Sequence, residues 1–238
     1  MTTPSTTSSR GLIVFVGIAT VASLLSVFYK QRKDREKKIH RRTGRTLTEA
    51  EEYVARSIRV NMPPARRMGI TVENVVLRQQ AQGQDQQGSV SLSMPIQGNT
   101  NIHGSGFAGS LYSVCVLSAW YTLVMHLRQS LGDEILEKAT VVIKSAEISY
   151  RHPVWKTSNN EYIVATSYLS SNDAEWEIFL SKLKDTGKTT CNISGEIIIY
   201  KKLSQSSNGT KKDATEDETT VRAVEFKGVL CALIPPSK

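Results

Sequence analysis

The sequence predicts an α+β domain in which an antiparallel sheet wraps around one long central helix. The first observation behind this prediction is the stretch 107–125, which carries no charged side chain and has apolar side chains on every side. A helix that is apolar all round is buried all round. The second is that strand-like segments flank this stretch closely. The third is the order of the elements, two strands, the helix and then four strands, which is α+β architecture.

The segments that flank the helix have the patterns of strands. Before it, 69–78 and 89–95 are expected strands, and the second alternates apolar and polar side chains as a half-buried strand does. Four further strands are expected after it, at 139–150, 161–169, 189–201 and 221–234. A short helix is expected at 173–183, with Trp176, Phe179, Leu180 and Leu183 on one face. The polar segments 79–88 and 204–220 are expected loops.

A shorter helix is predicted ahead of these strands. Thr48 and Glu51 have the spacing of a capping box, and apolar residues follow at helical spacing. We expect this amphipathic helix to run to about Asn61 and to be stopped by Pro63 and Pro64.

Residues 11–29 form an uncharged apolar run of 19 residues. As a helix the run would be about 28 Å long, close to the thickness of a bilayer core. A cleaved signal peptide is the competing interpretation, but it would have a basic segment in front and a shorter apolar core. Only Arg10 precedes the run, so we favour a transmembrane helix. The expected partner of this segment is a lipid bilayer.

The formal net charge of +8 is concentrated in one tract. Residues 30–45 contain nine basic and two acidic side chains, which leaves +1 for the rest of the chain. Because basic flanks resist translocation, the C-terminal domain is expected in the cytosol, with the mitochondrial outer membrane favoured over the endoplasmic reticulum. The tract lacks interleaved aromatic side chains, so no nucleic-acid partner is expected.

These boundaries divide the chain into five parts. They are a polar N-terminus (1–10), the transmembrane helix (11–29), the basic juxtamembrane tract (30–45), an amphipathic linker helix (46–62) and the globular domain (63–238). The three cysteines, Cys115, Cys191 and Cys231, have neither metal-ligand spacing nor a disulfide framework. They are expected to be buried free thiols, and neither a metal nor a cofactor is expected.

The globular part resembles a known family. Residues 99–112, NTNIHGSGFAGSLY, resemble the N-x-N-x-x-G-T-x-F-G-G-S-L-Y signature of the YiiD C-terminal thioesterase-like family, which has the hotdog fold. VLSAW at 116–120 resembles that family's V-L-x-G-W, and ISYRHPV at 148–154 is similar to the I-x-Y-x-x-P-V of many hotdog proteins. Ser105 replaces the usual Thr, and Ala108 replaces the first Gly of the glycine pair.

The resemblance covers roughly residues 60–236 and implies a function. It implies an acyl thioesterase that acts on coenzyme A or carrier-protein thioesters, and a homodimer with its active sites at the interface. Many hotdog thioesterases carry an Asp or Glu on the central helix, but no acidic residue occurs from Gly88 to Gly132. A carboxylate of this helix therefore cannot be the base or nucleophile.

Thioester hydrolysis needs donors for the developing oxyanion and a base or nucleophile. The start of the helix is the expected binding site, because amide N–H groups and the helix dipole favour negative charge there. The expected substrate-binding residues are Gly104, Gly106, Phe107, Ala108, Gly109 and Ser110.

Catalytic candidates follow from side-chain chemistry. Asn101 offers a further donor, and His103 has a suitable intrinsic pKa for a base. Tyr112 and Ser113 could orient water, and Glu147 could reach the site across a dimer. Each also has a structural interpretation: a loop histidine, a core tyrosine, a solvated glutamate, and glycines needed for close packing.

Three functions remain open on the sequence. The first is a membrane-anchored acyl thioesterase that acts on acyl-CoA or acyl-carrier thioesters. The second is a non-catalytic hotdog module that binds acyl-CoA or acyl chains. The third is a structural subunit of a membrane complex, since a fold does not dictate a function.

Overall fold

The computed structural model describes residues 46–78, 87–157, 161–202 and 218–234. They belong almost entirely to the second of two compact units, Leu47–Lys238; the first is Met1–Thr46. The expected transmembrane helix and basic tract lie outside the described residues, as do most of the two expected polar loops.

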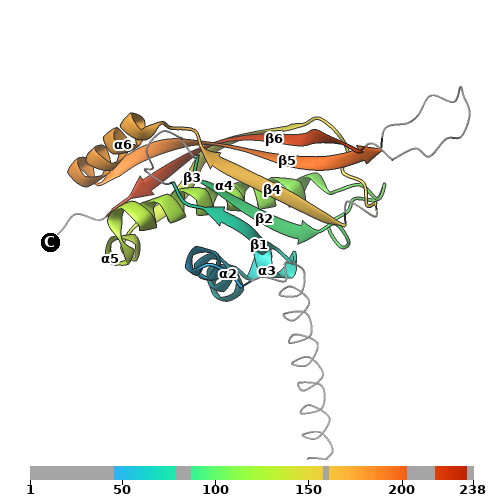
Figure 1. Cartoon of the computed structure of the whole chain (residues 1–238), viewed down its shortest axis with the longest axis horizontal. Coiled ribbons are helices and arrows are strands. Elements are labelled where there is room, and N and C mark those ends of the chain that lie inside the picture. Colours follow the sequence, from blue (N-terminus) through green and yellow to red (C-terminus); the bar gives the residue numbers. More distant parts are fainter. Residues whose placement is uncertain (1–45, 79–86, 158–160, 203–217, 235–238) are drawn as a thin grey trace, which may run out of the picture. The chain divides into compact units, whose positions relative to one another are not determined.

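The described elements follow the predicted order (Figure 1). The helices are α2 (Glu49–Asn61), α3 (Pro63–Arg67), α4 (Ala108–Leu131), α5 (Asp133–Leu136) and α6 (Asp173–Thr186). The strands are β1 (Thr71–Val76), β2 (Ser89–Pro95), β3 (Thr140–Tyr150), β4 (Tyr162–Leu169), β5 (Lys188–Lys202) and β6 (Glu218–Leu233).

The six strands form one antiparallel sheet in the order β1-β2-β4-β5-β6-β3. The long helix α4 packs against five of these strands, and α6 packs on β5 (Figure 1). The prediction of an α+β fold with a sheet around a central helix is therefore confirmed.

The helix α2 ends at Asn61, as predicted, and the structure adds the short helix α3, which begins at Pro63. Proline is favoured at the first position of a helix because its missing N–H has no partner there. The capping box at Thr48 and Glu51 is present as predicted.

One prediction needs correction: the helix α4 is not buried on all sides. Its first turn is open, since Phe107, Ala108 and Gly109 are exposed, whereas most of its later residues are buried. Within the described residues α4 is the one helix long and apolar enough to cross a membrane. Most of its apolar stretch is buried inside the protein, as expected of a core helix rather than a membrane span.

A buried polar stripe holds α4 against the sheet. Ser118, Thr122 and His126 follow at four-residue spacing and so share one face. The Ser118 hydroxyl donates to the Val90 carbonyl at 2.7 Å, and the Thr122 hydroxyl lies 3.2 Å from the Ser167 carbonyl. These bonds satisfy polar groups that would be costly to bury unpaired.

His126 ends this stripe under tight packing. It is 1% exposed, its Nδ1 lies 2.6 Å from the Thr122 carbonyl, and its ring meets Trp176 edge-on. Among the residues that the structure describes, its Nε2 has no hydrogen-bond partner. Burial lowers the pKa of His126, so the ring is neutral at pH 7 and Nδ1 donates to the carbonyl.

The His126 ring leaves no room for a side chain at position 88, so we predict that Gly88 is required there. A Cβ at Gly88 would lie 1.9 Å from His126 Nε2, and the ring is too enclosed to move away cheaply. We expect Gly88→Ala to lower the free energy of unfolding by about 1–3 kcal/mol. In a His126→Ala background the same substitution should cost much less, because the clashing atoms are gone. Denaturant unfolding of the four variants measures this, and equal losses in both backgrounds would contradict the packing described.

Candidate functional site

The turn that leads into α4 is fixed by two asparagines. The buried Asn99 side chain donates from Nδ2 to the carbonyls of Met68 (3.0 Å) and Pro95 (2.8 Å). Asn99 therefore fastens the turn to the end of β2 and to the segment before β1.

Asn101 organises the turn itself. Its Oδ1 accepts from the amides of His103 (2.9 Å) and Ser105 (3.2 Å), and its Nδ2 donates to Ser105 Oγ at 2.9 Å. An asparagine that bonds the backbone two and four residues ahead stabilises a turn by itself. Gly104 adopts φ +80° inside this turn, a conformation that favours glycine.

The next two amides are also occupied. Gly106 donates to the Val154 carbonyl at 2.7 Å, and Phe107 donates to the Asn99 carbonyl at 2.8 Å. A Cβ on Gly106 would approach the Leu111 and Val154 side chains at 3.3 and 3.4 Å. Gly106 thus joins the turn to the segment after β3, and neither amide is available for a substrate.

The first turn of α4 does have free donors. Phe107, its N-cap, makes no side-chain cap bond. Within the described part of the chain, the amides of Ala108, Gly109 and Ser110 have no acceptor. These N–H groups point towards the amino end of the helix, where the macrodipole is positive. This arrangement is suited to holding an oxygen that becomes negative.

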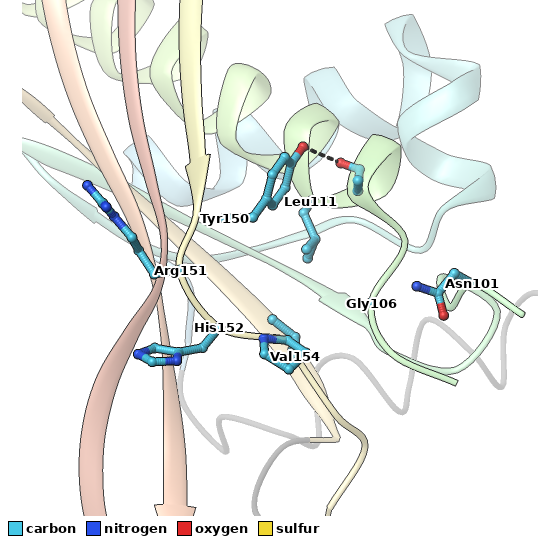
Figure 2. A pocket seen from close by; sticks show the side chains of 9 residues that line it. Asn101, Gly106, Leu111, Tyr150, Arg151, His152 and Val154 are labelled. Carbon is cyan, nitrogen blue, oxygen red and sulfur yellow. Dashed lines mark hydrogen bonds between the residues drawn. The ribbon is translucent and has the colours of Figure 1, made fainter. Parts of the chain in front are cut away.

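A hollow of about 280 Å³ lies at this end of α4 (Figure 2). It is lined by backbone and apolar groups together with four polar side chains; the residues are Asn101, Gly106, Ala108, Leu111, Tyr150, Arg151, His152, Pro153 and Val154. The hollow therefore lies between the turn, the start of α4 and the end of β3.

Tyr150, the last residue of β3, reaches across to the helix. Its hydroxyl donates to the Ala108 carbonyl at 2.9 Å (Figure 2). Burial, with smaller contributions from the neighbouring Cys115 and Tyr112, raises the pKa of Tyr150. The phenol is therefore protonated at neutral pH and can act as a donor.

Arg151 and His152 extend away from Tyr150, towards β6 (Figure 2). The backbone amides of both residues donate to the Ala223 carbonyl, at 2.8 and 3.1 Å. The guanidinium of Arg151 pairs with Glu225 at 2.8 Å. This anchoring fixes the chain where it leaves β3 and turns along the hollow.

The sequence-predicted site residues are only partly brought together. Asn101, Gly106 and Ala108 line the hollow, and Phe107, Gly109 and Ser110 are the adjoining positions. His103 and Gly104 are exposed on the turn and do not line it.

The other three candidates lie apart from the hollow. Tyr112 is in the first turns of α4, and the Ser113 hydroxyl is taken up by the Gly109 carbonyl at 2.7 Å. Glu147 is exposed on β3, opposite Lys227. The roles predicted for these residues stay predictions.

Sequence reasoning did not assign a role to Tyr150, Arg151 or His152. All three belong to the segment 148–154 that carries the second motif, ISYRHPV, so a signal was present. That signal marked a strand and its end, and only the fold places them beside α4.

The cysteines do not supply a nucleophile. Cys115, Cys191 and Cys231 are buried free thiols, as predicted. Burial raises the pKa of Cys115 and of Cys191 to about 12, so neither is a thiolate at neutral pH.

A family model described as "Putative thioesterase (yiiD_Cterm)" matches residues 51–210 of the chain. Among solved structures, a "putative thioesterase" from Shewanella oneidensis is 17% identical, with a TM-score of 0.53 over 79% of this chain and 100% of that chain. A protein of unknown function from Chlorobaculum tepidum is 19% identical, with a TM-score of 0.53 over 77% and 94%.

A thioesterase family protein from Silicibacter pomeroyi is 15% identical, with a TM-score of 0.50 over 78% and 98%. At such identities these likenesses show the fold alone, which is the hotdog arrangement of a sheet around a central helix. No curated protein matches the chain.

Proposed function

Because the chain belongs to the YiiD C-terminal thioesterase family, we propose that it hydrolyses acyl thioesters at the amino end of α4. The observation that carries this proposal is the set of three unpaired amides, Ala108, Gly109 and Ser110, beside a hollow lined by Tyr150 and His152. The substrate is an acyl-CoA or an acyl-carrier thioester.

The reaction follows from this arrangement. The thioester carbonyl oxygen binds at the open amides, and water attacks the carbonyl carbon. The oxygen gains negative charge in the tetrahedral intermediate, which the amides and the helix dipole stabilise. The intermediate collapses, the carbon–sulfur bond breaks, and the thiolate leaves and takes up a proton. The apolar side chains of Leu111 and Val154 flank the start of the acyl chain.

Two histidines are candidates for the base that takes a proton from water. Both histidines are exposed: His103 lies on the turn and does not line the hollow, whereas His152 lines it and extends towards β6. Imidazole titrates near neutral pH, where a general base is most effective. We assign the role to His152.

A non-catalytic acyl-binding module is the second candidate function. The observation in its favour is that none of the described residues that line the hollow carries a carboxylate. Such a module would keep its acyl ligand intact.

We propose further that the domain forms a homodimer through β3. This strand is at one end of the sheet order and, within the described residues, pairs along its length with β6 alone. Its Val142 and Ile143 are 43% and 37% exposed. An exposed edge of apolar, β-branched residues is a template for another strand, and a second copy offers a matching edge.

The proposal also includes a membrane anchor. The uncharged run 11–29 and the basic tract 30–45 support it, and they favour a cytosolic domain on the mitochondrial outer membrane. A third function, as a structural subunit, has no specific observation in its favour.

We predict that the full chain in detergent releases free thiol from a panel of acyl-CoAs of increasing chain length. His152→Gln should lower kcat by about 10²–10⁴-fold, as expected for loss of a general base. The matched variant His103→Gln should retain activity within about twofold, since its side chain is outside the hollow. A thiol-release assay measures both.

Two other outcomes would contradict the assignment. If His103→Gln alone lost thiol-release activity, His103 on the turn would be the general base. No thiol release at any chain length, together with an unchanged acyl ligand in native mass spectrometry, would favour the binding module.

We predict that Val142→Lys weakens the homodimer about tenfold or more, because it places like charges along one strand edge. The matched control is Ile178→Lys on α6, a helix that packs on β5, where the side chain is 67% exposed. Sedimentation equilibrium in detergent measures the dissociation constants. A wild-type monomer, or equal effects of the two substitutions, would overturn this interface.

We predict that the full chain resists alkaline carbonate extraction from mitochondrial membranes and that deletion of residues 1–29 releases it. Added protease should degrade the domain without rupture of the outer membrane. Recovery of the full chain in the soluble fraction would contradict the anchor.

A further inference from the structure

The hydrogen bond from Tyr150 to α4 acts on a particular peptide group. The Ala108 carbonyl, which accepts the bond at 2.9 Å, and the Gly109 N–H belong to the same planar peptide unit. A donor at the carbonyl oxygen draws electron density towards that oxygen. The N–H at the other end of the same peptide then becomes a stronger donor, because hydrogen bonds in a chain polarise one another.

The same bond fixes the orientation of this peptide. The first turn of α4 has no side-chain cap, and its residues Ala108 and Gly109 are exposed. Uncapped helix ends fray, since their first amides lack intrahelical partners. Tyr150 is itself held by the ladder between β3 and β6, in which it lies opposite Val224. A rigid strand therefore holds the first peptide of the helix.

We propose that Tyr150 is a positioning residue for the thioester site, which orients and polarises the Ala108–Gly109 peptide so that the Gly109 N–H binds the oxyanion. This inference rests on the function proposed above. Tyr150 acts through the peptide and transfers no proton to the substrate.

A purely structural role for Tyr150 does not explain its hydrogen bond to Ala108 as well. Tyr150 is 46% exposed, so it is not a fully buried side chain whose hydroxyl must find an acceptor within the protein. An exposed hydrogen bond of this kind adds little to stability. The acceptor that it does have is the first carbonyl of the helix, at the edge of the hollow.

The phenol stays protonated in this position and so remains a hydrogen-bond donor. Burial and the neighbouring Cys115 and Tyr112 all raise the pKa of Tyr150. The hydroxyl thus keeps its proton at neutral pH.

The test compares the full chain in detergent with Tyr150→Phe, which removes only the hydroxyl. The matched control is Tyr162→Phe at the start of β4, a similarly exposed tyrosine that does not line the hollow. Thiol release from acyl-CoA gives kcat and KM. The backbone amide of Gly109, observed in protein labelled with ¹⁵N-glycine and free of substrate, reports the polarisation directly.

We expect Tyr150→Phe to lower kcat about tenfold with KM changed less than twofold, since the bond strengthens one oxyanion donor without removing it. The Gly109 amide proton should move upfield, the melting temperature should stay unchanged, and Tyr162→Phe should match the wild type. A wild-type kcat in Tyr150→Phe would overturn the inference while the hydrolase proposal stands. A fall in kcat that follows the melting temperature would also overturn it. Absence of turnover by the wild type would overturn both.

Discussion

The position of the amino end of α4 relative to the end of β3 is the constraint on which the proposed site depends. Three hydrogen bonds set it: Tyr150 to the Ala108 carbonyl, Gly106 to the Val154 carbonyl, and Trp120 Nε1 to the Val141 carbonyl at 2.8 Å. The first two lie at the hollow, and the third lies three turns further along the helix. Together they hold α4 against β3, an edge strand of the described sheet.

The core also holds α4 in this position. The Ser118 and Thr122 hydroxyls bond the Val90 and Ser167 carbonyls inside the core, where polar groups are costly to leave unpaired. These bonds add to the apolar packing that determines where the first amides of α4 lie. The site and the core are therefore two consequences of the same packing.

Much of the fold could be predicted because local patterns and tertiary packing agree. The alternation in 89–95, the capping box at Thr48 and the run of apolar residues in 107–125 each specify an element that the structure contains. The short helix α3 was not predicted, because a proline that ends one helix can also begin the next. The exposure of the first turn of α4 depends on where the sheet ends, which no local pattern contains.

The site was less accessible from sequence for the same reason. The glycine-rich turn indicated a binding site lined by backbone amides. The amides of Gly106 and Phe107, however, donate to carbonyls about 48 and 8 residues away in the chain. Tyr150 and His152 lie some 40 residues from Ala108, and only the return of β3 brings them to the hollow. His103 was a candidate through its chemistry and its nearness in sequence; it does not line the hollow, and its predicted role stays a prediction.

The most direct test of this account is an NMR titration of the full chain with a ketone analogue of acyl-CoA, in which a methylene group separates the carbonyl from sulfur. The analogue keeps the carbonyl oxygen but cannot be hydrolysed. The account predicts saturable downfield shifts of the Ala108, Gly109 and Ser110 amide protons, and none at Gly187 beyond the far end of α6. Saturable binding that leaves those three amides unmoved would contradict it.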